Sequence, residues 1–331
     1  MDSKHFSTLI NDFKPGIFGA LNEKKEELLK EGRKVYNLSV GTPDFEPPLH
    51  VMKAMEEACK DPNNYKYSLA DMPELLEAVQ YRYEKRFGVH VEKDEIMSVY
   101  GSQEAMAHIG MVFCDPDEFY EKLIAFAKKN EIVILHDNAY SDITYGDKPG
   151  KSFLSFEGAK DVGAEFYSLS KSYNLTGARI SFVVGNKEII SKFRLLRSQI
   201  DYGIFYPVQY AAIAALIGPD DFIEEQRRQY ASRNKTLCGG LRRIGWDVRD
   251  SQGTMFVWAK IPEGYASSVD FCMKLMERTG VIVTPGSAFG SNGEGYVRMA
   301  LVVNESVIEE IVDVLDASGI FKKNSIKESD I

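Results

Sequence analysis

The stretch 164–185 constrains the fold of this chain more than any other. It contains two apolar runs, 164–169 and 180–184, and a polar segment with a glycine separates them. Each run is short enough to be a buried strand, and the segment between them is typical of a loop. Lys171 lies where the first run meets this loop. The pattern predicts two buried strands joined by a loop that carries an amine at its start.

The residues around Lys171 favour a chemical role over a structural one. Ser168 and Ser170 precede it, and Arg179 follows eight residues later. An amine becomes a nucleophile when desolvation or nearby cations lower its pKa toward neutrality. Arginine and serine together supply the charged and neutral donors that bind a phosphate dianion. A carbonyl compound that bears a phosphate and is held by a lysine is pyridoxal phosphate; the alternative is a solvated lysine at a strand end.

The block Ser-Leu-Ser-Lys, followed after seven residues by Arg179, resembles the Schiff-base lysine signature of the fold-type I, class I/II aminotransferases. The resemblance implies an α/β fold, with a mostly parallel sheet in a large domain and a smaller α+β domain made from both chain ends. The expected bounds are 46–229 for the large, pyridoxal-phosphate-binding domain and 1–45 with 230–331 for the small domain. The resemblance also implies a homodimer with shared active sites.

Composition and charge argue against several other classes of protein. With 331 residues, of which 44% are hydrophobic, the chain can bury a substantial core. A formal net charge of -9 argues against a nucleic-acid or anionic-membrane partner. Four scattered cysteines lack metal-ligand spacing, which predicts reduced thiols and no metal site, and no apolar run has the length of a signal peptide core or a membrane span. We therefore expect a cytoplasmic protein.

A third apolar run, 131–137, is expected to be a buried strand that ends on Asp137. A carboxylate at the carboxyl end of such a strand lies where open α/β sheets bind ligands. Against a pyridine nitrogen it would keep that nitrogen protonated and the ring an electron sink. Tyr140, three residues later, could donate to the phenolic oxygen of the ring. The alternatives are a helix N-cap for Asp137 and core packing for Tyr140.

Two further phosphate contacts are expected elsewhere in the chain. Residues 95–100 read as a strand, and Gly101, Ser102 and Gln103 turn from it directly into a helix. The unpaired N–H groups and the dipole at such a helix start favour an anion, so the amides of Ser102 and Gln103 are expected donors. The resemblance also implies that Tyr67 reaches the cofactor phosphate of the neighbouring subunit; the alternative is a tyrosine packed at a helix start.

Two residues are expected to bind the substrate. Arg298 lies inside the apolar run 296–301, and a charge in such a run requires an anionic partner. In the family that the chain resembles, this arginine binds the α-carboxylate of the substrate with two parallel hydrogen bonds. The resemblance likewise makes the backbone N–H of Gly41 a contact of that carboxylate, although the sequence Gly-Thr-Pro-Asp at 41–44 also fits a plain turn.

The resemblance fails at one place, directly after Asp117. Members of the family continue there through a block of roughly sixty residues, about half a typical domain, whereas here the helix expected from Glu118 follows at once. That block normally carries an aromatic residue stacked on the cofactor ring and an asparagine that donates to the ring oxygen, and neither has a candidate in this chain. Either a real segment is omitted from the sequence, which we favour because the other cofactor residues are in place, or the chain carries a deletion. The intact mass of the protein would distinguish the two.

The predicted activity is transfer of an amino group between an amino acid and a 2-oxo acid by a ping-pong mechanism, with Lys171 moving the α-proton. Besides Arg298, which is expected to bind the α-carboxylate, no second arginine plainly serves a side-chain carboxylate, which favours alanine or other neutral substrates over aspartate. The alternatives are a pyridoxal-phosphate-dependent carbon–sulfur β-lyase and a truncated, inactive scaffold.

Overall fold

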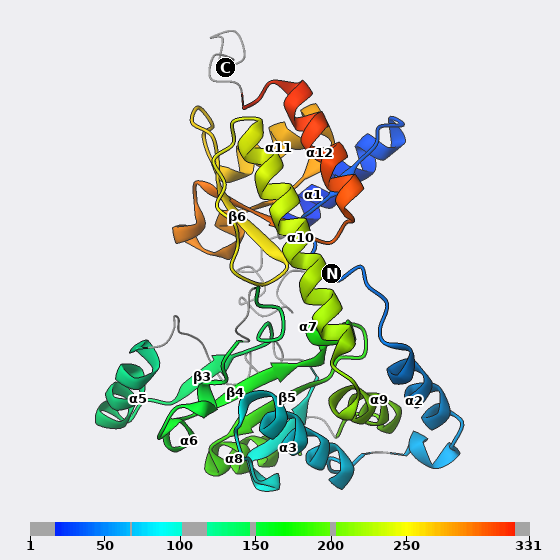
Figure 1. Ribbon diagram of the computed structural model, residues 1–331, viewed down its shortest axis with the longest axis vertical. Coiled ribbons are helices and arrows are strands. Elements are labelled where there is room, and N and C mark those ends of the chain that lie inside the picture. Colours follow the sequence, from blue (N-terminus) through cyan, green and yellow to red (C-terminus); the bar gives the residue numbers. More distant parts are fainter. Residues whose placement is uncertain (1–16, 67, 101–117, 146–149, 199–202, 322–331) are drawn as a thin grey trace, which may run out of the picture. The chain divides into compact units, whose positions relative to one another are not determined.

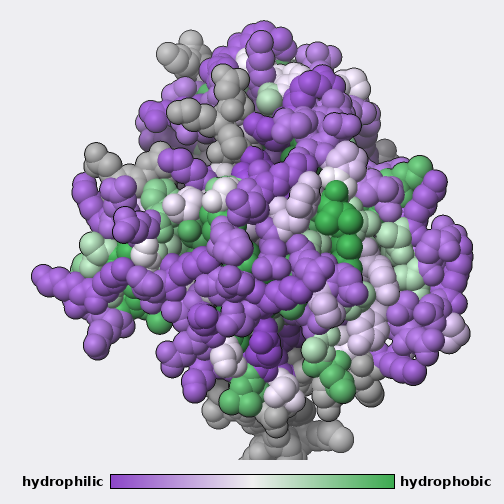
Figure 2. Space-filling view, turned by 60° about the horizontal axis from the view of Figure 1, so that its bottom comes forward, coloured by the Kyte–Doolittle hydropathy of each residue, from purple (hydrophilic) through white to green (hydrophobic). Residues whose placement is uncertain are grey.

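A computed structural model describes residues 17–66, 68–100, 118–145, 150–198 and 203–321. The chain forms two compact units (Figure 1), a larger one of Pro43–Gln229 with Gln252–Thr254 and a smaller one of Met1–Thr42, Tyr230–Ser251 and Met255–Ile331. Within the described ranges, no helix is long and apolar enough to cross a membrane. The face turned forward in Figure 2 is covered largely by polar side chains, with smaller apolar patches among them.

A four-stranded sheet forms the framework of the larger unit (Figure 1). Its order is β2 (Ile96–Val99), β5 (Ser181–Gly185), β4 (Gly163–Ser168) and β3 (Ile134–Asp137). β5 is antiparallel to both of its neighbours, whereas β3 is parallel to β4. β2, β3 and β4 therefore run in one direction and β5 runs in the opposite one, so that β3 and β4 form the parallel pair among the described strands.

Helices are interspersed among these strands along the chain. They are α2 (Leu49–Cys59), α3 (Pro73–Phe87), α5 (Glu118–Asn130), α6 (Ala159–Val162), α7 (Leu169–Ser172), α8 (Lys187–Arg197) and α9 (Tyr206–Ile217), with 3-10 turns η3 (Pro62–Tyr65), η4 (Lys93–Glu95) and η5 (Phe153–Ser155). The long helix α10 (Asp221–Arg243) contributes residues to both units.

Both faces of the sheet are covered, because successive strand residues point to opposite sides. Ala164 and Phe166 of β4 belong to a core cluster with residues of α8. Tyr167, the residue after Phe166, points to the opposite side and belongs to a larger cluster with residues of α3 and α9. All six residues of β4 are buried, as the apolar run predicted for a strand inside an α/β sheet.

The ends of α3 illustrate how local sequence sets the helix bounds. Pro73 occupies the first helical position, where its missing N–H costs nothing, and Glu74 follows in the first turn. Lys85 and Arg86 lie in the last turn, where they complement the negative end of the helix dipole. Gly88 ends the helix with a φ of +65°, a conformation that glycine adopts without strain.

The strand expected at 131–137 is shorter in the structure, because its first residues terminate α5. Glu131 has a φ of +55°, and the backbone N–H of Ile132 donates to the oxygen of Ala127 at 3.0 Å. This is a left-handed helix end, in which the chain reverses direction before a strand can start. Ile132 and Val133 are exposed, so the prediction of a buried strand over 131–133 was wrong.

The smaller unit combines both ends of the chain. It contains α1 (Ile17–Lys30), β1 (Tyr36–Asn37), β6 (Phe256–Lys260), α11 (Ser268–Thr279), β7 (Val281–Ile282), β8 (Thr284–Pro285), η6 (Gly286–Phe289), η7 (Ser291–Gly293), β9 (Tyr296–Ala300) and α12 (Glu305–Ser318). β6, β9 and β8 form an antiparallel sheet in that order, and β1 pairs in parallel with β7.

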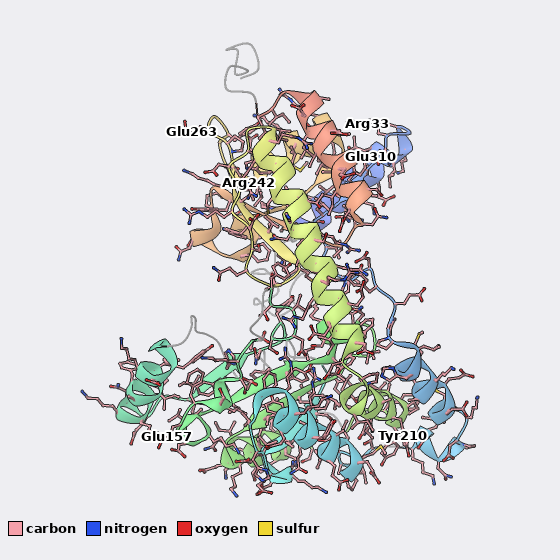
Figure 3. All side chains as sticks on the ribbon, viewed as in Figure 1. Arg33, Glu157, Tyr210, Arg242, Glu263 and Glu310 are labelled. Atoms are coloured by element: carbon pink, nitrogen blue, oxygen red, sulfur yellow. The ribbon has the colours of Figure 1, made fainter. Side chains whose placement is uncertain are left out.

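Hydrogen bonds tie the N-terminal segment into this unit. The N–H of Leu38 donates to Ile282 at 2.9 Å, and the N–H of Ala300 donates to Leu38 at 2.8 Å. The hydroxyl of Tyr36 donates to the carboxylate of Glu310 in α12 at 2.6 Å; Glu310 is labelled in Figure 3. Residues just after β1 are therefore held beside the carboxyl end of β9.

Candidate functional site

The register of the larger sheet gathers several predicted site residues at one edge. Ser181, at the start of β5, lies opposite Ser168 at the end of β4 and opposite Val99 at the end of β2. Asp137, at the end of β3, lies beside Phe166. The carboxyl ends of β2, β3 and β4 therefore meet at the same edge, which is where open α/β sheets bind ligands.

Lys171 lies in α7, the short helix that begins directly after β4. The hydroxyl of Ser168 caps this helix by accepting the backbone N–H of Ser170 at 3.2 Å, and it lies 2.8 Å from the hydroxyl of Ser181. Ser170 is buried and Lys171 is half-buried. The amine is thus carried to the edge of the sheet on a backbone that both β4 and β5 hold in place.

Gln226 of α10 fixes the loop after Lys171. Its side-chain N–H₂ donates to the main-chain oxygen of Lys171 at 3.1 Å and to the side-chain oxygen of Asn174 at 2.8 Å. Asn174 has a φ of +56°, a left-handed conformation that asparagine tolerates better than most residues. Gln226 could not be predicted from the sequence, because nothing in a polar helix marks one glutamine as a partner of a distant loop.

Arg179 lies at the end of the same loop, just before β5. Its guanidinium donates to the main-chain oxygen of Thr176 at 2.9 Å and to that of Tyr100, the residue after β2, at 3.4 Å. Its φ of +52° is unfavourable for a residue with a side chain. Backbone strain of this kind persists only where surrounding contacts enforce it. Arg179 is exposed and adjoins the end of β2.

Asp137 is the last residue of β3, and part of the residue is exposed. One carboxylate oxygen accepts the N–H of Ala139 at 3.2 Å, which makes a local turn rather than the helix N-cap considered above. Desolvation by the surrounding sheet raises the pKa of Asp137, and this hydrogen bond and nearby His136 oppose the rise. The half-buried Tyr140 follows within the same turn.

Beneath the edge, Glu165 of β4 is a fully buried carboxylate that sequence reasoning missed. It accepts hydrogen bonds from the hydroxyls of Tyr83 and Ser152, each at 2.9 Å, and from the N–H of Phe153 at 2.6 Å. A ring nitrogen of His136 lies 2.9 Å away. The signal was available, since a single acid inside an apolar run must find partners when it is buried.

A second buried network surrounds Asp142, in the turn after Tyr140. Its carboxylate accepts from Arg82 at 3.1 Å, from Arg86 at 2.9 Å and from the hydroxyl of Tyr167 at 2.6 Å. Asp142 is 0% exposed and Arg82 is 1% exposed. The turn that carries Tyr140 is therefore anchored to α3 by a buried ion pair.

In the smaller unit, Arg298 projects from β9. Its guanidinium donates to the main-chain oxygen of Ser39 at 3.3 Å. The guanidinium carbon lies 4.1 Å from the ring centre of Phe256 and 4.5 Å from that of Phe289. The structure brings Gly41 to the same place, since a Cβ built on Gly41 would lie 2.4 Å from Cζ of Phe256.

Four predicted contacts lie outside the described residues. They are Tyr67, Gly101, Ser102 and Gln103. The larger sheet thus collects the other predicted cofactor contacts at one edge, and the smaller unit places the two predicted carboxylate contacts together.

Comparisons with known proteins give one family. The family model described as aminotransferase class I and II matches residues 116–315. An LL-diaminopimelate aminotransferase of Halothermothrix orenii is 34% identical, over 94% of this chain and 98% of that protein. The LL-diaminopimelate aminotransferase of Nitratidesulfovibrio vulgaris is 32% identical, over 90% and 95% of the two chains.

Solved structures agree with these sequence matches. The substrate-bound structure of BacF from Bacillus subtilis has a TM-score of 0.88 and 27% identity, covering 96% of this chain and 98% of that chain. A probable N-succinyldiaminopimelate aminotransferase from Thermus thermophilus has a TM-score of 0.84 and 26% identity, covering 92% and 100%.

The alignment with the Halothermothrix orenii protein is longer than the chain itself. It spans 381 positions yet includes 94% of 331 residues, so about 70 of its positions hold no residue of this chain. The alignment with the Nitratidesulfovibrio vulgaris protein spans 370 positions and includes 90% of this chain, so a similar number of its positions hold no residue of this chain. These relatives therefore contain a substantial amount of chain that has no counterpart here.

Proposed function

This chain belongs to the class I and II aminotransferases, pyridoxal-phosphate-dependent enzymes of fold type I that transfer an amino group between an amino acid and a 2-oxo acid, and we propose that Lys171 is its catalytic lysine. The observation that carries this proposal is the register of the larger sheet, which groups Lys171 with Asp137 and Arg179 at one edge. We further propose that the enzyme is a homodimer with shared active sites.

The residues at this edge fit the cofactor in their chemistry. A carboxylate suits the protonated ring nitrogen, an amine suits the aldehyde, and hydroxyls with a guanidinium suit the phosphate. Asp137 fits the ring nitrogen because it is a carboxylate at the carboxyl end of β3, and a cation beside it would lower the pKa that burial raises. When bound, pyridoxal phosphate supplies an electron sink for the electrons left as the α-proton departs.

Lys171 holds and moves the proton in this scheme. Its amine would hold the cofactor at the aldehyde, and the amine freed by the amino acid would take up the proton from Cα and return it in the next half-reaction. The bond from Gln226 to the Lys171 main-chain oxygen keeps the backbone fixed while the side chain moves. The amine therefore returns to the same position in each half-reaction.

The phosphate is assigned to the loop that flanks Lys171. Arg179 offers a charged donor from an exposed guanidinium, and the buried Ser170 offers a hydroxyl. Ser168 already has two partners, the Ser170 N–H and the Ser181 hydroxyl. Ser168 acts mainly by capping α7, and this cap sets the orientation of the short helix that carries Ser170 and Lys171. Tyr140 is assigned to the phenolic oxygen of the cofactor, and Tyr67, Gly101, Ser102 and Gln103 complete the cofactor contacts.

Arg298 is assigned to the α-carboxylate of the amino acid, together with Gly41. For the rest of the substrate, the named relatives make LL-diaminopimelate the leading candidate. Its far end carries both an ammonium and a carboxylate, so its side chain is neutral overall. That carboxylate differs from the expectation of alanine or another neutral substrate, which was drawn from the lack of a second arginine that plainly serves a side-chain carboxylate.

The substrate assignment is tested with a panel of amino donors against 2-oxoglutarate. We expect kcat/KM for LL-diaminopimelate to exceed that for L-alanine and L-aspartate by at least about tenfold, because each well-placed polar contact is worth about 1.4 kcal/mol or more. A preference for aspartate would overturn the assignment. Release of pyruvate from cystathionine without a 2-oxo acid would instead indicate a β-lyase, and absence of both activities with added cofactor an inactive scaffold.

Asp137→Asn is expected to lower kcat by about 10²–10³-fold, because the amide cannot hold the charge opposite a protonated ring nitrogen. The measurement is steady-state kinetics at saturating cofactor, so that weakened cofactor binding is not mistaken for slower chemistry. Asp94→Asn is the matched control, since Asp94 makes an exposed ion pair with Lys187 at 3.5 Å. Equal kcat values for the wild type and Asp137→Asn would exclude Asp137 as the ring partner.

A further inference from the structure

Arg298 lies among aromatic side chains on one face of the small sheet. The register pairs Trp258 of β6 with Arg298 and Phe256 with Ala300, so Phe256, Trp258 and Arg298 share that face. Phe256 is the diagonal neighbour of Arg298, within reach of a long side chain. Phe289, at the end of η6, packs edge-on against Trp258 with ring centres 5.8 Å apart.

The phenyl rings of Phe256 and Phe289 restrict the orientation in which the Arg298 guanidinium can bind a ligand. A guanidinium offers hydrogen bonds only in its own plane, and aromatic rings favour contact with the face of a cation. With Phe256 at 4.1 Å and Phe289 at 4.5 Å, water is displaced from much of the group and its rotation is restricted. Its N–H groups point outward in that plane, the orientation that planar recognition of a carboxylate requires, and one of them donates to Ser39.

We propose that Phe256 and Phe289 are positioning residues for the carboxylate-binding arginine, and that residue 41 is glycine because the Phe256 ring occupies the space a side chain would need. The proposal rests on the assignment of Arg298 to the α-carboxylate. A methyl group on residue 41 would lie 2.4 Å from Cζ of Phe256 and 2.9 Å from Cε1, so the ring would have to swing away. Gly41 thereby acts on Arg298 through Phe256.

The first test removes each ring in the enzyme with its cofactor. Phe256→Leu and Phe289→Leu are each expected to raise KM for the amino acid about tenfold and to leave kcat within about twofold. Phe289 is 47% exposed, so its replacement leaves folding intact. Phe289→Tyr retains the ring and is expected to keep KM near that of the wild type.

Phe271→Leu is the matched control for loss of a phenyl ring in the same unit. Phe271 is 0% exposed and packs against Trp246 and Tyr265. Its replacement should lower the midpoint of thermal unfolding without raising KM. If Phe271→Leu raised KM as much as Phe256→Leu does, the effect would reflect general destabilisation and the proposal would be wrong.

The second test asks whether Gly41 acts through Phe256. Gly41→Ala alone is expected to raise KM about tenfold, whereas in the Phe256→Leu background the same change should add less than about twofold. A direct clash between the new methyl group and the substrate would give the full tenfold rise in both backgrounds, which would overturn this part of the proposal.

The underlying assignment is tested separately by Arg298→Ala. If this variant leaves KM unchanged, the role of Arg298 in binding carboxylate fails, and the positioning roles fail with it. If Arg298→Ala raises KM by two orders of magnitude or more but both ring variants match the wild type, Arg298 binds the carboxylate without aromatic positioning. Only the positioning roles of Phe256 and Phe289 are then rejected.

Discussion

Lys171→Ala is expected to lower kcat by about 10⁴-fold or more, because it removes both the covalent anchor of the cofactor and the base that moves the α-proton. The fold should survive, since Lys171 is half-buried and its main-chain oxygen, which accepts from Gln226, is unchanged by the substitution. Steady-state kinetics with the best amino donor provide the measurement, and the midpoint of thermal unfolding verifies the fold.

A chemical readout makes this expectation specific to one side chain. Borohydride reduction of the enzyme with its cofactor, followed by peptide mass spectrometry, should place the cofactor on the peptide that contains Lys171. Lys187→Ala is the matched control, because Lys187 is an exposed lysine paired with Asp94 at 3.5 Å, and it should keep full activity. Recovery of the reduced cofactor on another lysine, or activity of Lys171→Ala within tenfold of the wild type, would refute the assignment.

Asp142→Asn is expected to reduce the free energy of unfolding by about 3–5 kcal/mol, the usual cost of breaking a buried ion pair. The substitution keeps the shape of the side chain but removes the charge that balances Arg82 and Arg86. Urea unfolding measures the change. Asp161→Asn is the control, since Asp161 pairs with Lys128 at the surface at 2.6 Å, and its loss should cost less than about 1 kcal/mol.

The same carboxylate gives the stability of the protein a dependence on pH. Burial acts to raise the pKa of Asp142, but Arg82 and Arg86 outweigh it and hold that pKa below its ordinary value. A carboxyl group whose pKa is lower in the folded state than in the unfolded state stabilises the folded protein. This contribution is complete at a pH above the unfolded-state pKa of about 3.9. That contribution is lost as the pH falls through the folded-state pKa. The difference in stability between the wild type and Asp142→Asn should therefore shrink below pH 4; a difference that stays constant down to pH 2 would contradict this.

Local patterns in the sequence predicted the fold where short-range physics decides it. The apolar runs at 164–169 and 180–184 became β4 and β5 with bounds shifted by one residue. The run at 131–137 misled, because hydrophobicity alone does not reveal that Glu131 adopts a left-handed conformation that closes α5. The common direction of β2, β3 and β4 agrees with the mostly parallel sheet that the family resemblance implied.

Contacts between distant segments could not be predicted in the same way. Gln226 reaches the Lys171 loop across 55 positions of sequence, and Phe256 meets Arg298 only through the register of β6 and β9. Composition does not encode register, so these partners emerge only from the structure. Glu165 is the intermediate case: its need for partners is visible in the sequence, whereas the identity of those partners is not.

The alternation of side chains along β4 links stability to the position of the catalytic lysine. Glu165 and Tyr167 face the buried polar networks, whereas Ala164 and Phe166 face the apolar surface of α8. A slip of β4 by one residue against its neighbours would turn a carboxylate into that apolar surface and a phenyl ring toward the buried charges. The buried ions therefore select a single alignment of the strand. That alignment fixes where β4 ends, and with it the point from which Lys171 leaves the sheet.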